Sequence, residues 1–173
     1  RGWRGPVVYT FSQSQLVERI ARRLGLDSVE TPIGFKHIAE LMLKSQILIG
    51  GEESGGIGLS CHLPERDGLF LQLLVLDLLA TTGKELNVLI EEMWAEFGEF
   101  HFSRRDLHVP SDTSERLIAR LIERPPNDLA GRSIDEVRTL DGLKWMLEGQ
   151  GWILFRRSGT EPVLRMYCEA PTE

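Results

Sequence analysis

Short apolar runs alternate with segments of helical periodicity in the first part of the chain, and this alternation most constrains the fold. Runs typical of short strands cover residues 7–10, 29–31 and 47–49. Between them, apolar residues recur at helical spacing, at Leu16, Val17, Ile20 and Leu24 and again at Ile38, Leu41 and Met42. Strands that alternate with helices indicate a mainly parallel sheet in a layered α/β/α domain.

Two more helices are predicted before the character of the chain changes. Residues 67–82 are apolar on nearly every face, so this helix is expected to be buried. Residues 84–97 have an amphipathic pattern that ends at Gly98. We therefore predict a first domain over residues 1–98 and a second domain over residues 99–173.

The second domain has the pattern of a smaller α+β unit with an antiparallel sheet. One helix is expected over residues 114–123, and Gly149-Gln150-Gly151 is typical of a hairpin turn. Strands are predicted at residues 100–105, 137–140, 142–147, 152–155 and 163–169. The expected fold class is therefore α/β, a layered domain followed by this α+β domain.

A glycine-rich loop follows the strand predicted at residues 47–49. It reads Gly50-Gly51-Glu52-Glu53-Ser54-Gly55-Gly56-Ile57-Gly58, in which five glycines free the backbone around two carboxylates and one hydroxyl. Open α/β sheets bind ligands at strand ends. These groups suit the hydroxyls of a sugar better than a phosphate, which the carboxylates would repel. A solvated turn is the alternative interpretation.

A second polar loop joins two strands predicted in the second domain. It reads Arg156-Arg157-Ser158-Gly159-Thr160-Glu161-Pro162. Guanidinium groups bind phosphate oxygens bidentately, and hydroxyls and backbone N–H groups supply further donors. The loop lacks the Gly-Lys-Thr ending of a Walker A motif. It is either a phosphate cradle or a polar hairpin with solvated arginines.

Composition limits the possible partners and compartments. The net charge of −6 over 173 residues argues against a general binder of nucleic acids or anionic membranes. Cys61 and Cys168 match no metal spacing and imply no disulfide framework, which fits a reducing, cytoplasmic location. The apolar run at residues 69–80 is too short to span a bilayer.

The two loops, in this order and about a hundred residues apart, resemble the C-terminal half of the α-D-phosphohexomutases. This family includes phosphoglucomutase, phosphomannomutase and phosphoglucosamine mutase. The glycine-rich loop is similar to the sugar-binding loop of the third domain, and the arginine loop to the phosphate-binding loop of the fourth. Supporting matches are Thr31-Pro32-Ile33-Gly34-Phe35-Lys36, Asp67-Gly68 and Asp141-Gly142, so the resemblance covers essentially the whole chain.

The resemblance implies roles for individual residues. Glu52 and Ser54 would bind the sugar hydroxyls at positions 3 and 4. Lys36 matches a substrate-contacting lysine of the glucomutase branch, although an exposed helix lysine would look the same. Arg157 stands where many relatives have proline. The phosphate on the non-reacting end of the substrate would be held by Arg156, Ser158, Gly159 and Thr160.

The resemblance also implies chemistry that this sequence does not contain. The family reaction uses a phosphoserine in the first domain and Mg²⁺ held by an aspartate-rich loop in the second. Neither a Thr-Ala-Ser-His-Asn-Pro stretch nor an Asp-Gly-Asp-Gly-Asp loop is present, and the chain starts with Arg1 instead of methionine. We therefore expect a fragment, inactive alone, whose partners are the missing N-terminal domains of the same chain.

The implied activity of the parent is that of an isomerase acting on a phosphosugar substrate. It interconverts hexose 1-phosphate and hexose 6-phosphate, with glucose 1,6-bisphosphate as intermediate and activator. Gly56 stands where many mannose-active and glucosamine-active relatives carry histidine, so glucose is the expected sugar. A phosphomannomutase, a phosphoglucosamine mutase and a non-catalytic phosphosugar-binding module remain alternatives. Closure of the last domain would make the segment near Gly98 a hinge.

Overall fold

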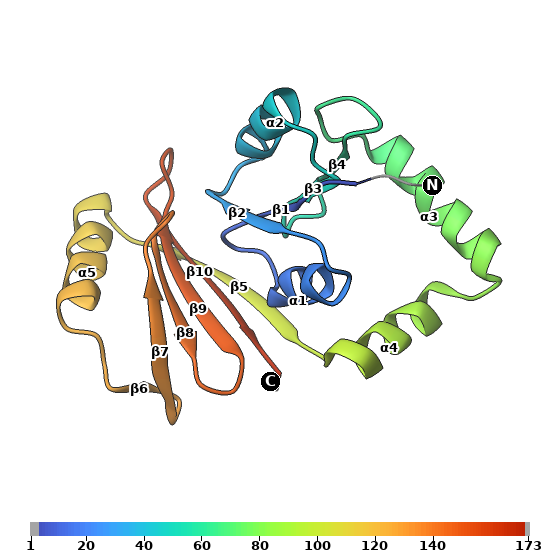
Figure 1. The fold of residues 1–173 in the computed structure, drawn as a ribbon. Helices are drawn as coiled ribbons and strands as arrows, with labels where there is room; N and C mark the ends of the chain where they lie inside the picture. The colour runs from blue at the N-terminus through green and yellow to red at the C-terminus, as the bar shows by residue number, and fades with distance from the viewer. Residues whose placement is uncertain (1–3, 172–173) are drawn as a thin grey trace. The chain divides into compact units, whose positions relative to one another are not determined.

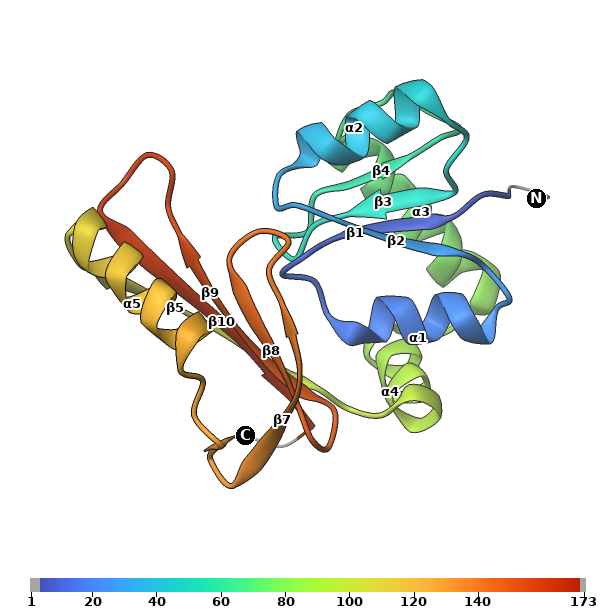
Figure 2. The same cartoon turned by 60° about the vertical axis from the view of Figure 1, so that its left-hand side comes forward.

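The computed structural model describes residues 4–171 and divides into two compact units, residues 1–99 and 100–173. The start of the chain at Arg1 and the last two residues lie outside the described part. Figure 1 and Figure 2 show both units as ribbons from two directions. Each unit has its own sheet, so the two are described separately.

The first unit is a four-stranded sheet with helices on both of its faces. Its strands are β1 (Val7–Thr10), β2 (Ser28–Thr31), β3 (Ile49–Gly51) and β4 (Ile57–Leu59), in the order β2-β1-β3-β4. β1 pairs in parallel with β2 and β3, while β4 is antiparallel to β3. The helices α1 (Gln15–Arg23) and α2 (Phe35–Lys44) lie on opposite sides of this sheet (Figure 2). The prediction of a layered domain with a mainly parallel sheet is confirmed.

Close packing against α2 explains the glycines in β3. The core on this side consists of Val8, Phe35, Ile38 and Ile47. A Cβ atom at Gly50 would lie 2.2 Å from the Cγ2 atom of Ile38, so a side chain there would clash with the core. The strand predicted at residues 47–49 is shifted: β3 starts at Ile49 and includes the first two residues of the glycine-rich loop.

Two helices follow the sheet, and one of them differs from its prediction. α3 (Gly68–Thr82) begins at the N-cap Asp67, whose carboxylate accepts from the Leu69 and Phe70 N–H groups, and α4 (Leu86–Phe97) follows it. The expectation that α3 is buried is wrong, because none of its residues is buried and Leu73 is 64% exposed. An apolar pattern indicates that a helix is stabilised when other segments pack against it, but the pattern does not show that such a segment is present.

The second unit is a six-stranded antiparallel sheet in the order β5-β10-β9-β8-β7-β6, as the sequence predicted for its fold class. The strands are β5 (His101–His108), β6 (Asp128–Leu129), β7 (Arg132–Arg138), β8 (Leu143–Leu147), β9 (Gly151–Arg157) and β10 (Val163–Ala170). The helix α5 (Ser111–Glu123) packs on one face, where Ile118 and Leu121 contact a core of Leu143, Trp145, Phe155 and Leu164.

The predicted element types in this unit are observed with shifted ends. β7 ends at Arg138, although a strand was expected at residues 137–140. α5 starts three residues before its predicted start, at Ser111. The turn between β8 and β9 has positive φ at Gly149 and Gln150, as a tight hairpin requires. Within residues 4–171, no helix combines the length and the apolar character needed to cross a membrane.

Candidate functional site

The glycine-rich loop forms a closed turn between β3 and β4. The Gly55 N–H donates to the Glu52 carbonyl at 3.0 Å, and the Glu52 N–H donates to the Gly56 carbonyl at 2.9 Å. Gly55 has a φ of +89°, a conformation that favours glycine. The turn leaves Ser54 exposed at its tip. The hydrogen-bonded backbone of the turn therefore fixes the Cα positions of the polar residues in this loop.

Glu52 is buried and paired with a cation. It is 8% exposed, and its Oε2 atom lies 3.4 Å from Nη1 of Arg66. The Arg66 guanidinium also lies over the ring of Phe35, with 5.2 Å from Cζ to the ring centroid. Burial raises the pKa of the Glu52 carboxyl above its ordinary value, while the charge of Arg66 acts in the opposite direction.

Glu53 is anchored to the end of β1 by two hydroxyls. The Ser12 hydroxyl donates to its Oε2 atom at 2.5 Å, and the Thr10 hydroxyl donates to the same atom at 3.4 Å. Both hydroxyl residues are completely buried. Sequence reasoning gave Ser12 no part in the site. The signal available in the sequence was the pair of hydroxyl residues, two positions apart, at the end of a predicted strand.

Lys36 lies beside this arrangement on the first turn of α2. Its side chain is exposed, and it follows Phe35, the residue that carries Arg66 on its ring. The N-cap residue Gly34 has a φ of +127° and no side chain with which to cap the helix. The structure thus brings Glu52 and the start of α2 together through Arg66, and it leaves Lys36 and Ser54 open to solvent.

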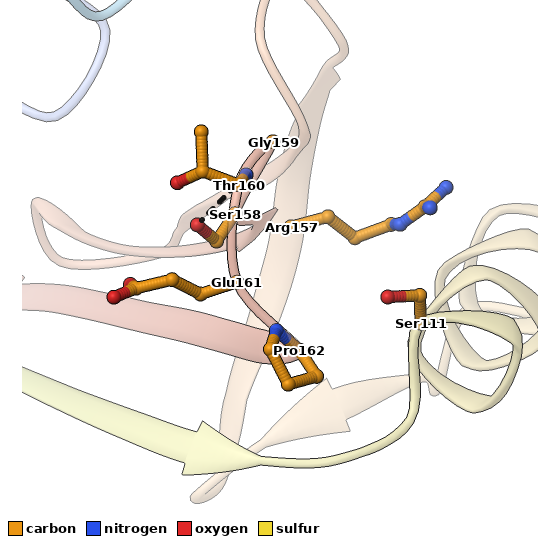
Figure 3. Close-up of a pocket in the computed structure, with 7 residues that line it drawn as sticks. All are labelled: Ser111, Arg157, Ser158, Gly159, Thr160, Glu161 and Pro162. Atoms are coloured by element: carbon orange, nitrogen blue, oxygen red, sulfur yellow. Dashed lines mark hydrogen bonds between the residues drawn. The ribbon is translucent and has the colours of Figure 1, made fainter.

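The arginine loop is a tight connection between β9 and β10 with a pocket on one side. The Ser158 N–H donates to the Val163 carbonyl at 2.9 Å, which closes the connection. The pocket has a volume of about 360 Å³. Figure 3 shows the residues that line it, which are Ser111, Arg157, Ser158, Gly159, Thr160, Glu161 and Pro162. Ser158, Gly159 and Thr160 thus line the same pocket.

The two arginines of this loop have different surroundings. Adjacent residues of a strand point to opposite faces of the sheet. Arg157 lines the pocket with Ser111, and its Nη1 atom lies 3.4 Å from Oε2 of Glu115 on α5. Arg156 does not line this pocket, and its Nε–H donates to Oδ2 of Asp141 at 3.0 Å. Sequence reasoning assigned Arg156 to phosphate and did not foresee its carboxylate partner.

The described residues do not fit a metal site. Between residues 4 and 171, no three His, Cys, Asp or Glu side chains are grouped so that they could hold a metal ion. The acidic residues of the glycine-rich loop are instead engaged with Arg66, Ser12 and Thr10. We therefore assign no step of the chemistry to a metal held by these residues.

The fold and its two loops define a known pair of domains. Residues 1–97 match the family described as phosphoglucomutase/phosphomannomutase, alpha/beta/alpha domain III, and residues 120–173 match the C-terminal domain of the same family. The chain therefore belongs to the phosphoglucomutase/phosphomannomutase family.

Individual relatives carry several enzyme names. A phosphoglucomutase/phosphomannomutase of Thermococcus kodakarensis is 32% identical over 169 residues, which are 98% of this chain and 35% of that protein. A phosphoglucosamine mutase of Methanocaldococcus jannaschii is 30% identical over 95% of this chain and 35% of its own length. The chain thus spans about a third of the length of these curated relatives.

The fold is shared with solved structures. A protein from Thermus thermophilus that is described as a phosphomannomutase has a TM-score of 0.78 and 40% identity. The match covers 99% of this chain and 33% of that structure. The likeness extends over both units and again over about a third of the longer protein.

Proposed function

We propose that this chain recognises the substrate in an isomerase that interconverts hexose 1-phosphates and hexose 6-phosphates. The observation that carries the proposal is the match of residues 1–97 and 120–173, which contain the two loops, to domain III and the C-terminal domain of the family. The glycine-rich loop presents a buried carboxylate beside an exposed hydroxyl, and the arginine loop places hydroxyls and the Arg157 guanidinium around a pocket. The names of the relatives support this reaction class.

The proposed work of this chain is to hold and orient the substrate. Glu52 and Ser54 accept and donate hydrogen bonds to sugar hydroxyls, and Lys36 contributes a cation at the same end of the fold. The distal phosphate is held by Arg156, Ser158, Gly159 and Thr160. Positioning of a substrate by such groups supplies much of the rate enhancement of an enzyme.

The bond chemistry is proposed to belong to other domains of the family. We assign the phosphoserine, the Mg²⁺ ion that neutralises the transferring phosphoryl group and the handling of glucose 1,6-bisphosphate to the domains that precede domain III in longer relatives. In this proposal those N-terminal domains are the partners of the chain. No residue described here is given a role in breaking or forming the phosphate ester.

Glucose is the sugar that we propose as preferred. A Cβ atom at Gly56 would lie 2.5 Å from Cδ of Arg66 and 3.2 Å from Oε2 of Glu52. Any side chain at this position would therefore displace Arg66 from its place beside Glu52. Gly56 stands where many mannose-active and glucosamine-active relatives carry histidine, and on this ground we propose a glucose preference over mannose or glucosamine.

Phosphomannomutase or phosphoglucosamine mutase activity is the second candidate. It is favoured by the relatives that carry these names. A comparison of kcat/KM for glucose 1-phosphate, mannose 1-phosphate and glucosamine 1-phosphate in a full-length protein containing this chain decides between them. A higher kcat/KM for either of the last two sugars overturns the glucose preference.

The sugar-loop assignment is tested by Glu52→Gln and Ser54→Ala in the same full-length protein. A hydrogen bond to a charged group contributes roughly 1.5–3 kcal/mol, so Glu52→Gln should lower kcat/KM about tenfold or more. Thr160→Ala, on the other loop, is a useful comparison because it should weaken phosphate binding without changing sugar preference. An unchanged kcat/KM for both sugar-loop variants would refute the assignment.

A further inference from the structure

Asp141 is fixed next to strand β9 by the glycine that follows it. The turn between β7 and β8 contains Asp141 and Gly142, and Gly142 has a φ of +110°. A Cβ atom at Gly142 would lie 2.5 Å from the Phe155 carbonyl oxygen and 3.2 Å from Cα of Arg156. Only glycine permits this turn to approach the backbone of β9 so closely. The approach places the Asp141 carboxylate beside the Arg156 side chain.

The contact between these residues uses one edge of the guanidinium group. The Arg156 Nε–H donates to Oδ2 of Asp141 at 3.0 Å, and the two side chains are only 20% and 25% exposed. Within residues 4–171, the Arg156 side chain forms no other hydrogen bond or ion pair. A bond at Nε fixes the plane of the guanidinium group, and it leaves both Nη groups as donors for a ligand.

We propose that Asp141 is a positioning residue that orients Arg156 for phosphate binding. This inference rests on the proposed function of the arginine loop. A flexible arginine loses side-chain freedom when it binds a ligand, whereas an arginine that is already held in place loses less. Asp141 therefore favours phosphate binding through the order that it imposes on Arg156, although its own charge repels an anion.

The neighbouring pair of Arg157 and Glu115 provides a matched control. Its Nη1 to Oε2 distance is 3.4 Å, and the two side chains are 39% and 68% exposed. An exposed pair of this kind orders its arginine little and contributes little free energy. Loss of Glu115, like loss of Asp141, removes one negative charge that lies next to an arginine of the arginine loop. The two changes therefore separate an effect of orientation from an effect of charge.

The experiment measures binding of glucose 6-phosphate to the 173-residue chain by NMR titration. Asp141→Ala is expected to raise Kd about two- to tenfold, the range of the ordering cost of one long side chain. Asp141→Asn should raise Kd less, because its amide oxygen still accepts from Nε, and Glu115→Ala should leave Kd unchanged or lower. If Asp141→Ala does not fold, Asp141→Asn carries the same comparison.

A double-mutant cycle and a spectroscopic signal show whether Asp141 acts through Arg156. In an Arg156→Ala background, Asp141→Asn should not weaken binding further. The Nε–H resonance of Arg156 should be sharp in the wild-type chain and broadened or shifted in Asp141→Ala. A structural role of Asp141 alone would lower the melting temperature without giving this pattern.

The outcomes separate failure of this inference from failure of the proposed function. An Asp141→Ala variant that binds glucose 6-phosphate as tightly as wild type, or more tightly, overturns the positioning role. If Arg156→Ala binds like wild type, or if the wild-type chain shows no shifts in residues 158–160, the phosphate-loop assignment itself is wrong. The Arg156 Nε–H signal still tests the orientation in that case.

Discussion

Glu52 and Glu53 are neighbours in the sequence, but their carboxylates have different surroundings. Glu52 is paired with Arg66 beside the start of α2, whereas Glu53 accepts hydrogen bonds from Ser12 and Thr10 at the end of β1. In the proposed function, the first carboxylate binds a ligand that displaces or joins Arg66. The other holds the loop on the sheet, which is a structural task that residue type alone does not indicate.

The burial of Glu52 makes the stability of the fold depend on pH. Its pKa is raised mainly by burial, so the folded state binds this proton more tightly than the unfolded state. The stability from this group is fully present below the unfolded pKa of about 4.3, and it is lost as the pH rises through the folded pKa.

Glu52→Gln should remove this loss and make the first unit more stable at neutral pH, while it weakens sugar recognition. Urea denaturation of both chains at several values between about pH 4 and pH 7 measures the effect. If the variant shows the same decline in stability as wild type, another group is responsible for it. A gain in stability with a loss of binding would be typical of a functional residue.

Arg156 and Arg157 should differ in how they tolerate substitution. Arg156→Lys keeps the charge but loses the planar group that Asp141 holds, so kcat/KM of a full-length protein should fall strongly. Arg157→Gln removes a charge that is exposed and partly offset by Glu115, so its effect should be mild and should shrink as salt is added. The assignment is reversed if Arg157→Gln is the more damaging change.

Two apolar helices of the first unit illustrate that hydrophobicity and burial are separate properties. Ile38 on α2 is completely buried in the core with Val8 of β1, whereas Leu73 on α3 is 64% exposed. Ile38→Ala should therefore destabilise the chain by about 2–5 kcal/mol. Leu73→Ala should change the stability by no more than about 0.5 kcal/mol, as is usual for a surface position.

Urea unfolding of the two alanine variants, followed by circular dichroism, measures this difference. Leu43→Ala is a suitable control, because Leu43 is an exposed leucine on α2. If Leu73→Ala costs as much as Ile38→Ala, then α3 is covered in solution and its leucines belong to a core.

The order and type of the elements could be predicted from the sequence, because they depend on local periodicity. The alternation of strands with helices and the antiparallel second sheet were both found by this reasoning. The close approach of Gly50 to Ile38 was not, since these residues are brought together only by the fold. The predicted burial of α3 was wrong for a similar reason, because the apolar pattern of one segment does not show which other segments pack against it.

The loops of the candidate site could be recognised from their residue composition, but the residues that their side chains contact could not. Residue types at a strand end indicated the polar groups of the glycine-rich loop. The pairing of Glu52 with Arg66 and of Arg156 with Asp141 joins residues that are 14 and 15 positions apart. Such contacts depend on side-chain packing around turns, which has no repeating pattern in the sequence.

At the scale of the whole molecule, the chain is expected to bind but not to convert its substrate. It spans about a third of its curated relatives and lacks the serine and aspartate-rich motifs that the reaction requires. A coupled assay for glucose 6-phosphate, started with glucose 1-phosphate in the presence of Mg²⁺ and glucose 1,6-bisphosphate, should show no turnover. A full-length relative is the positive control, and turnover that scales with the concentration of this chain contradicts the expectation.

The position of β10 in the second sheet has a consequence for biosynthesis. β10 pairs with β5 on one side and with β9 on the other, so an interior strand of this sheet follows all of its neighbours in the sequence. A nascent chain can pair β7, β8 and β9 as they emerge, but β5 waits for residues 163–170 before it can join them. Such non-local pairing slows folding. A premature stop shortly before Val163 would therefore leave β5 unpaired and the arginine loop without its second strand.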